Sequence, residues 1–331
     1  MIPLNELTIL IDKELPKLEK AVKSILGKGL NHPWVESPFF DDIIVSAKLS
    51  SDLETIAKGY HENGYLITQL EPDPSRLEKI KAVHQKYSEL ERHLTNVWTK
   101  EEAVKKLSCH EGVLKLLKFL YIRNPVPYQT LNFKVGSQQR AHQDSIHFSS
   151  TPSKFMTGVW MAFEEIHKDN GPLFYIPKSH KWQFWDIHDI GAHEDCHTYS
   201  ERGTPYSSFL EKHIESKKAT EVSLSAPADT IFIWSSNLMH GGKKILNEGL
   251  TRYSMVSHYF YEGCQYYSPL MSTPFSGDTR LINFKNIITG KQAYNPKSTL
   301  PSQGPLYKQW LRAMRNKLFN IRSNPDDPYY S

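Results

Sequence analysis

The sequence predicts an α+β fold, mainly β with helical additions, in which a sandwich or jelly roll of short strands carries helices on its outside. Two observations support this fold class. The first third of the chain has apolar residues at helical spacings of three and four. From Tyr128 onward, short runs rich in β-branched and aromatic residues alternate with clusters of Gly, Pro, Asn and Asp. Such a pattern is typical of two packed antiparallel sheets.

Helices are expected throughout the first third. The apolar positions of residues 4–28 form one face of a helix that is interrupted near Pro16. Its other face is rich in lysine, and we expect it to be solvated, although a basic helix can also touch a membrane surface. Two prolines predict irregular structure over residues 31–49. The other elements expected here are a helix capped by Ser50, a strand over 64–68, and charged helices over 74–98 and 101–120.

Five strands are expected in the second part, and a long segment without clear strands separates the third from the fourth. That segment, residues 181–227, is rich in aromatic residues and histidine. We interpret it as a lid or substrate wall rather than as a disordered loop. An amphipathic helix over 306–318 is expected to dock on the core or to form a homodimer contact. The strands are expected over 128–135, 155–163, 173–176, 230–234 and 250–261.

Composition limits the classes of partner. The net charge of +4 is small for 331 residues and gives no concentrated basic patch, which disfavours nucleic acid. No apolar run approaches 18 residues, so no membrane span is expected. The N-terminus lacks the layout of a signal peptide. Three widely spaced cysteines, Cys109, Cys196 and Cys264, argue against a disulfide framework. Together these features predict a cytoplasmic protein in a reducing compartment.

The run Arg140-Ala141-His142-Gln143-Asp144-Ser145 holds a histidine and a carboxylate two residues apart. Side chains at positions i and i+2 of an extended segment point to the same face, so this pair can offer two ligands to one metal ion. The best candidate for a third ligand is His240, which precedes Gly241 and Gly242. Two histidines and one carboxylate on one side of a metal are the ligand set of non-haem Fe(II) oxygenases.

A second pair of residues fits a carboxylate ligand. Arg252 and Ser254 alternate onto one face of the strand expected over 250–261. If this strand pairs antiparallel with the segment that holds His240, Arg252 lies near the metal but not on it. There, the guanidinium can hold a dicarboxylate through two parallel charged hydrogen bonds, and Ser254 adds a hydroxyl donor.

With these motifs, the sequence resembles the phytanoyl-CoA dioxygenase family of Fe(II)/2-oxoglutarate-dependent oxygenases. The resemblance covers roughly residues 55–262 and rests on four features. They are His142-x-Asp144, His240 followed by Gly241, Arg252-x-Ser254, and the run Asn170-Gly171-Pro172-Leu173-Phe174-Tyr175-Ile176-Pro177-Lys178-Ser179-His180. The last run departs from the family at Lys178, where the family usually has glycine, a change that affects a turn and not a ligand.

The resemblance implies a double-stranded β-helix, a cupin-like jelly roll, with iron between its sheets. His142, Asp144 and His240 would bind Fe(II), and Arg252 and Ser254 would bind 2-oxoglutarate as cosubstrate. Trp160 and Gln143 are further candidates for the cosubstrate pocket, although core packing explains Trp160 equally well. The implied reaction uses O2 to hydroxylate an aliphatic C–H of a small-molecule metabolite, with release of succinate and CO2.

We expect one catalytic domain over residues 1–331. Its parts are a mainly helical segment over 1–125, the jelly-roll core over 126–265 with the lid described above, and a C-terminal extension over 266–331. The sequence does not identify the substrate, because neither the fold nor the metal ligands determine it.

Several alternatives remain open. A non-catalytic cupin-like binding protein would keep the same fold. The run His193-Glu194-x-x-His197 matches a zinc peptidase motif, but its flanks lack the apolar periodicity of the helix that this motif requires. A polar surface loop is therefore the favoured interpretation. We expect His147 to be hydrogen-bonded or to face the substrate, and His180 to have a structural role or to contact a metal ligand. We expect His258 to contact the metal ligands rather than the metal.

Overall fold

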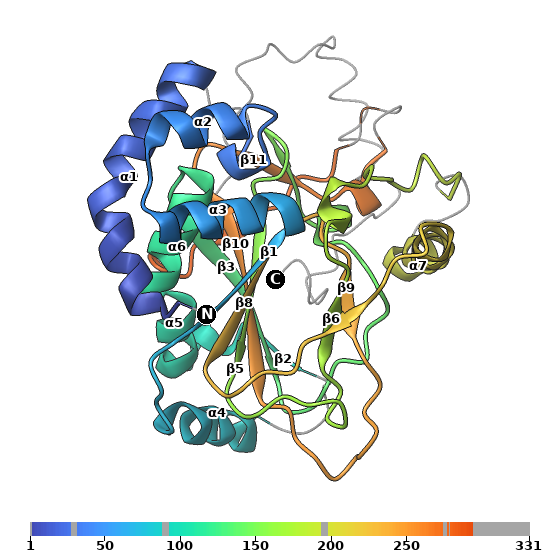
Figure 1. Cartoon of the computed structure of the whole chain (residues 1–331). Coiled ribbons are helices and arrows are strands. Elements are labelled where there is room, and N and C mark those ends of the chain that lie inside the picture. Colours follow the sequence, from blue (N-terminus) through green and yellow to red (C-terminus); the bar gives the residue numbers. More distant parts are fainter. Residues whose placement is uncertain are drawn as a thin grey trace.

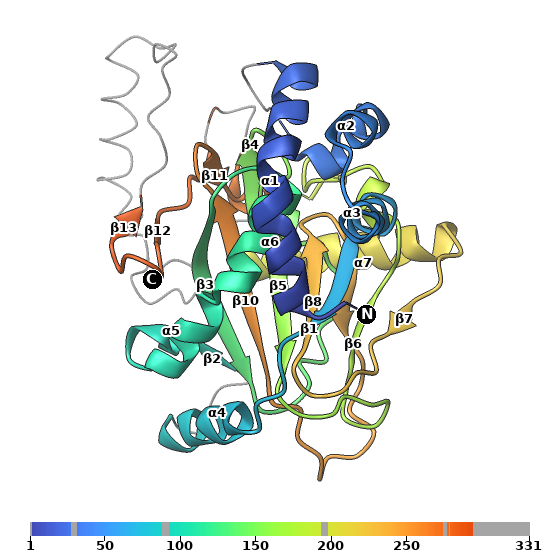
Figure 2. The same ribbon diagram turned by 60° about the vertical axis from the view of Figure 1, so that its left-hand side comes forward.

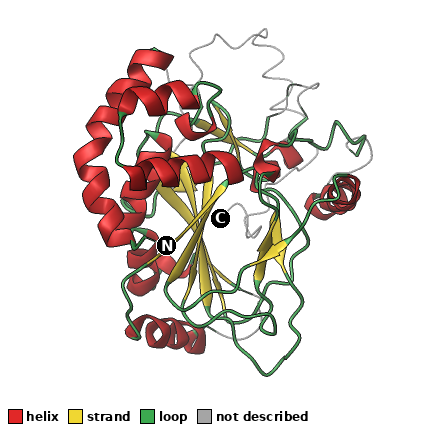
Figure 3. Ribbon diagram, viewed as in Figure 1, coloured by secondary structure: helices red, strands yellow, loops and turns green. Residues whose placement is uncertain are grey.

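The computed structural model describes residues 2–27, 32–87, 93–192, 198–273, 277 and 279–293. Two antiparallel sheets face each other, and helices cover the outer side of each (Figures 1 and 3). The large sheet has the strand order β1-β8-β5-β10-β3-β2, and the small sheet has the order β7-β6-β9. This arrangement confirms the expected α+β class with a jelly-roll core.

The strands of the large sheet are β1 (Tyr65–Gln69), β2 (Leu94–Thr95), β3 (Pro125–Phe133), β5 (Thr157–Ala162), β8 (Thr230–Ser235) and β10 (Ser254–Tyr261). The small sheet contains β6 (Leu173–Tyr175), β7 (Val222–Ser223) and β9 (His240–Gly242). Two further pairs are β4 (Ser149–Thr151) with β11 (Gln265–Tyr267), and β12 (Phe284–Lys285) with β13 (Gln292–Ala293).

Among the described residues, six α-helices precede β3, and they gather on the outer side of the large sheet (Figure 2). A seventh lies beyond the small sheet, on the opposite side of the molecule (Figure 1). The helices are α1 (Leu4–Leu26), α2 (Phe40–Ala47), α3 (Ser51–Asn63), α4 (Ser75–Lys86), α5 (Glu102–Ser108), α6 (Glu111–Tyr121) and α7 (Tyr199–Ser216).

Alternation along β5 and β8 separates two hydrophobic cores. Successive side chains of a strand point to opposite faces. Trp160, Phe232 and Trp234 therefore lie between the two sheets. Val159 and Ile233 point the other way and join the core that the helices cover. Both strands are buried along their whole length, which explains why their sequences are nearly continuous apolar runs.

The first third differs from the sequence-based expectation in four places. The segment expected to be irregular holds a 3₁₀ turn at Trp34–Glu36 and helix α2, whose buried residues recur at helical spacing. Its prolines precede α2 rather than interrupt it. The helix expected over 74–98 ends at Lys86, and the helix expected over 101–120 is divided into α5 and α6. Helix α1 continues through Pro16, because its apolar face is buried on both sides of that residue.

The segment 181–227 contains a regular element that the sequence pattern does not predict. Helix α7 packs through Tyr206, Leu210 and Ile214, spaced four residues apart, against a hydrophobic cluster that includes Ala141 and Ile146. Pro205 lies inside this helix and obscures its periodicity. The expected lid is therefore partly a helix that packs against the segment that holds His142 and Asp144.

Three expectations fall outside the described residues. They are the His-Glu-x-x-His run over 193–197, the helix over 306–318, and the homodimer contact assigned to that helix. Among the residues that the structure does describe, no helix is both long and apolar enough to cross a membrane.

Candidate metal centre

Backbone pairing brings two distant histidines together. The amide of His142 donates to the carbonyl of His240 at 3.0 Å, and the amide of His240 donates back at 3.1 Å. This isolated antiparallel bridge puts the two residues directly opposite each other. Their side chains consequently share one face, and their ring centroids lie 4.3 Å apart.

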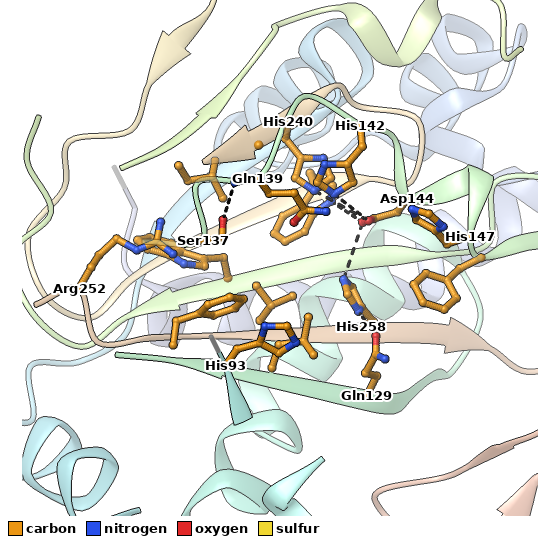
Figure 4. A pocket seen from close by; sticks show the side chains of 18 residues that line it. His93, Gln129, Ser137, Gln139, His142, Asp144, His147, His240, Arg252 and His258 are labelled. Carbon is orange, nitrogen blue, oxygen red and sulfur yellow. Dashed lines mark hydrogen bonds and ion pairs between the residues drawn. The ribbon is translucent and has the colours of Figure 1, made fainter. Parts of the chain in front are cut away.

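Asp144 completes a three-residue cluster. It begins a short 3₁₀ turn, Asp144–Ile146, and its Oδ1 atom lies 3.8 Å from Nε2 of His142 and 3.8 Å from Nε2 of His240. One ligand atom from each of the three residues lies within 4.8 Å of the others. Figure 4 shows the two imidazoles and the carboxylate pointing at one another. The sequence-predicted ligands therefore converge at one point.

In each imidazole, the nitrogen that points away from Asp144 forms a hydrogen bond, and this identifies the other nitrogen as the one that can coordinate a metal. Nδ1 of His142 bonds the carbonyl of Arg140 at 3.0 Å, and Nδ1 of His240 bonds the carbonyl of Leu238 at 2.9 Å. A carbonyl only accepts hydrogen bonds, so each Nδ1 carries the proton. In the neutral form of each ring, the lone pair of Nε2 points toward Asp144, as a metal-binding histidine requires.

The local electrostatics favour the protonation states that bind metal. Burial and, to a smaller extent, neighbouring His240 lower the pKa of His142 to about 3, against the opposing effect of Asp144. Burial alone would raise the pKa of Asp144, but His240, His258 and His142 together with a hydrogen bond from Trp234 outweigh it and lower that pKa. The cluster is thus an ionised carboxylate beside a neutral imidazole, which fits a divalent cation.

A cavity of about 320 Å³ opens beside this cluster. His142, Asp144 and His240 line one end of it, and Arg252 reaches into the other end (Figure 4). The remaining wall is mostly apolar or uncharged. It consists of His93, Gln129, Leu131, Phe133, Ser137, Gln139, His147, Phe148, Trp160, Leu173, Trp234, Gly241, Val256 and His258.

Arg252 is a buried cation with an unused donor. Its side chain donates to the carbonyl of Gly171 at 3.0 Å, whereas Nε has no hydrogen-bond partner among the described residues. Burial lowers the pKa of Arg252 to about 10, and Glu164 opposes that shift, so the guanidinium stays charged at neutral pH. Its charged group lies 5.9 Å from the ring of Trp160. A buried charge without an ionic partner is costly, so this group fits an anionic ligand.

Of the other three residues expected to bind the cosubstrate, only Trp160 lies in the wall of the cavity. Ser254 is fully buried and donates to the carbonyl of Arg252 at 3.3 Å, and it does not line the cavity. Gln143 also lies outside the cavity wall, where its amide donates to the carbonyl of Asn237 at 2.6 Å and faces α7 through Tyr206. The cosubstrate role of these three residues stays a prediction.

The sequence left open an antiparallel pairing between the segment that holds His240 and the strand that follows it. This pairing does not form. Strand β9 pairs with β6, and β10 pairs with β3 and β5 in the opposite sheet. Arg252 precedes β10, and its amide donates to the carbonyl of Lys134. It reaches the cavity from across the sandwich, which explains why it lies near the metal cluster without belonging to it.

Three further histidines, His147, His180 and His258, were singled out in the sequence. Nε2 of His180 bonds the carbonyl of His61 at 3.1 Å, and its ring packs against Gly64, which fits the structural role expected for it. His147 and His258 both line the cavity. Nε2 of His258 lies 3.8 Å from Oδ2 of Asp144, as expected for a residue that contacts a metal ligand.

Sequence reasoning missed two residues at this site, Trp234 and Gln129. The indole Nε1 of Trp234 donates to Oδ2 of Asp144 at 2.8 Å, and Gln129 accepts a hydrogen bond from His258 at 2.8 Å. Both lie on strands that the sequence predicted. The alternation of side chains along those strands was the only sign that these two side chains point into the sandwich.

Comparisons with known proteins agree with this geometry. The family model for phytanoyl-CoA dioxygenase (PhyH) matches residues 81–253. Phytanoyl-CoA dioxygenase domain-containing protein 1 of Danio rerio is 33% identical over 84 residues, which cover 24% of this chain and 29% of that protein. Its homologue in Caenorhabditis briggsae is 31% identical over 81 residues, covering 23% and 28%. The aligned segments therefore span less than a third of these relatives.

Solved structures share the fold. The non-heme alpha ketoglutarate dependent epimerase SnoN from nogalamycin biosynthesis superposes with a TM-score of 0.53 at 15% identity, over 77% of this chain and 96% of that chain. The carbocyclase SnoK from the same biosynthesis gives a TM-score of 0.51 at 14% identity, over 66% and 86%. With the family model matching more than half of its 331 residues, the chain belongs to the phytanoyl-CoA dioxygenase family of Fe(II)/2-oxoglutarate-dependent oxygenases.

Proposed function

We propose that this chain is an Fe(II)- and 2-oxoglutarate-dependent dioxygenase that hydroxylates an aliphatic C–H bond of a small molecule. One observation carries the proposal: a cluster of two imidazoles and one carboxylate faces, across a single cavity, a buried guanidinium whose Nε has no hydrogen-bond partner among the described residues. The first group of side chains suits a divalent metal, and the second suits a carboxylate. A dicarboxylate that also chelates the metal would satisfy both.

His142, Asp144 and His240 would hold the iron from one side and leave the side facing the cavity open. Arg252 would bind the far carboxylate of the cosubstrate, and the aromatic wall of Trp160 and Phe133 would exclude water. When bound, iron together with 2-oxoglutarate and O2 supplies the oxidising power, with succinate and CO2 as by-products. The chain itself contributes orientation, charge and a dry cavity.

The test measures iron-dependent formation of succinate from 2-oxoglutarate by the wild-type protein and by His142→Ala and Asp144→Ala. We expect both variants to remain folded and to lose this turnover. His167→Ala is the matched control, because His167 is half-exposed and does not line the cavity. Wild-type turnover in both variants, with iron still bound, would remove the assignment of the metal ligands. A wild-type protein that binds iron but forms no succinate would instead be a binding protein.

The outcome of the reaction on its substrate needs a separate measurement. We expect the product to carry one additional oxygen atom, since Asp144 fills a metal position and leaves no vacancy for a halide ligand. Mass spectrometry of the product decides this point once a substrate is identified. Loss of two hydrogens would indicate desaturation or ring closure, and a chlorine isotope pattern would contradict the proposal.

A further inference from the structure

We propose that a row of residues across four strands of the large sheet, Trp234, Gly158, His258 and Gln129, positions the carboxylate of Asp144. In this role Trp234 holds one carboxylate oxygen, so that only the other oxygen is free to bind the metal. The proposal rests on the function proposed above, because it concerns the same metal centre. It concerns positioning residues, which act on the metal through Asp144.

Strand register places these four residues side by side. Trp234 of β8 lies opposite Gly158 of β5, Gly158 lies opposite His258 of β10, and His258 lies opposite Gln129 of β3. Residues directly opposite in antiparallel strands point to the same face of the sheet. Here that face looks into the sandwich, and Figure 4 shows His258 pointing toward Asp144, with Gln129 behind it.

The contact that defines the row is the hydrogen bond from Trp234. Its indole Nε1 donates to Oδ2 of Asp144 at 2.8 Å, and both residues are buried. An indole can only donate, so this bond fixes Oδ2 as an acceptor that is already in use. The other oxygen, Oδ1, is the one that faces Nε2 of both metal-ligand histidines. The two oxygens of one carboxylate are thus assigned to different partners.

This division of the carboxylate has a consequence for coordination. A carboxylate that is free to rotate can bind a metal through both oxygens and so occupy an additional position. The bond from Trp234 opposes that rotation, because turning Oδ2 toward the metal would leave a buried N–H without a partner. We therefore infer that Asp144 binds through one oxygen and keeps the cavity side of the metal open.

Gly158 makes the approach of Trp234 possible. A Cβ atom at position 158 would overlap with Cε2 and Cζ2 of the Trp234 indole, so any side chain there would displace the ring. On the other side of Gly158, His258 stands almost perpendicular to the same indole, with ring centroids 6.4 Å apart. The glycine on β5, which lies between β8 and β10, thus gives the indole of Trp234 room to reach Asp144.

His258 gives Oδ2 of Asp144 a second neighbour. Its Nε2 lies 3.8 Å from that oxygen, and its Nδ1 bonds Oε1 of Gln129 at 2.8 Å. Gln129 therefore fixes the orientation of the His258 ring, and the ring limits the space into which Oδ2 can move. Both side chains are buried, so neither is free to turn away.

The test replaces Trp234 with Phe and measures the affinity for Mn(II) and Co(II) without 2-oxoglutarate. Loss of a bond that orients a metal ligand costs about 10–100-fold in metal affinity, and we expect a decrease in this range. We also expect the visible absorption spectrum of the Co(II) form to change as Asp144 gains freedom to bind through both oxygens. A purely structural role for Trp234 would leave that spectrum unchanged.

Trp160→Phe is the matched control. Trp160 is also a buried tryptophan of the same cavity, but its Nε1 has no hydrogen-bond partner among the described residues. The two variants remove the same atoms, and only one of them removes a bond to Asp144. We expect the Trp160→Phe protein to keep the metal affinity and the Co(II) spectrum of the wild type.

Gly158→Ala provides a second, independent variant that keeps the indole and displaces it. It should weaken metal binding as Trp234→Phe does, and the double variant should bind no more weakly than Trp234→Phe alone. Wild-type affinity and an unchanged Co(II) spectrum in whichever of the single variants folds would overturn the proposal. That result would leave the proposed function intact, whereas failure of the wild-type protein to bind metal would overturn the function itself.

Discussion

Arg252 is both buried and positively charged, and burial opposes the charge. It carries the only permanent positive charge among the described residues that line the cavity. Burial disfavours that charge, and the single contact with the Gly171 carbonyl does not satisfy the guanidinium. A bound carboxylate would supply both the missing charge and the missing acceptor, so the cosubstrate is expected to depend strongly on this side chain.

We expect Arg252→Ala to weaken binding of 2-oxoglutarate far more than binding of the metal. Loss of one partner from a buried charged pair costs roughly 2–5 kcal/mol, or about 30-fold or more in affinity. Calorimetric titration of 2-oxoglutarate at saturating Mn(II), and of Mn(II) alone, separates the two effects. Arg252→Lys should lie between the wild type and Arg252→Ala, because lysine keeps the charge and loses the planar fork.

Arg76→Ala is a suitable control for that experiment. Arg76 forms an ion pair with Asp229 away from the cavity, so its removal changes the net charge by the same amount without touching the site. If Arg252→Ala bound 2-oxoglutarate as tightly as Arg76→Ala does, the carboxylate clamp would have to be elsewhere.

At the scale of elements, the junction between α3 and β1 positions the edge of the large sheet. Gly64 ends α3 in the left-handed conformation with a φ of 80°, and its amide donates to the carbonyl of Tyr60. Tyr65 follows at once as the first residue of β1. A Cβ at position 64 would overlap with the ring of His180, so a glycine is required here by both conformation and space.

Replacement by alanine should change the free energy of unfolding in opposite directions at Gly64 and at Gly59. We expect Gly64→Ala to lower the free energy of unfolding by at least about 1 kcal/mol, since alanine disfavours positive φ. Gly59, inside α3, has open space around its Cα, and Gly59→Ala should raise the free energy of unfolding by about 0.5–1 kcal/mol. Denaturant unfolding of the metal-free protein measures both. A stable Gly64→Ala variant would contradict the assigned role of this turn.

At the scale of the whole molecule, buried neutral histidines link stability to pH. Burial lowers the pKa of His142 to about 3 and the pKa values of His84, His147 and His180 to about 4. The ordinary pKa of a histidine is 6.5. Between pH 6.5 and about 4 the unfolded chain therefore binds more protons than the folded protein. The stabilisation is complete above pH 6.5 and decreases as the pH falls through that window.

We expect the free energy of unfolding of the metal-free protein to decrease steadily as the pH is lowered from about 6.5 to about 4. Denaturant titrations at several pH values measure this slope. His180 lies outside the cavity, and His180→Gln removes one of these groups. The slope is proportional to the number of protons taken up on unfolding, and this number should fall by about one. A free energy that did not change with pH in this window would mean that the folded protein binds protons there as readily as the unfolded chain does, which would contradict the lowered pKa values of these rings.

Features that depend on local spacing can be predicted from the amino-acid sequence. The two-residue interval between His142 and Asp144, and the alternation along β5 and β8, decide which side chains share a face. The run after Asn170 and the glycine after His240 indicate the family, because they too are patterns of adjacent residues. Strands and helices with strong periodicity are predicted correctly for the same reason, since neighbours in the chain fix their pattern.

Features that depend on partners far apart in the chain come from the tertiary structure alone. Trp234 and Asp144 are 90 residues apart, and only the register of β8 brings the indole to the carboxylate. Likewise β10 joins β3 and β5 rather than β9, which places Arg252 across the cavity from His142, Asp144 and His240. Local spacing fixes the direction of a side chain, but the group it meets depends on which strands pair and in which register, and that is set by packing of the whole sandwich.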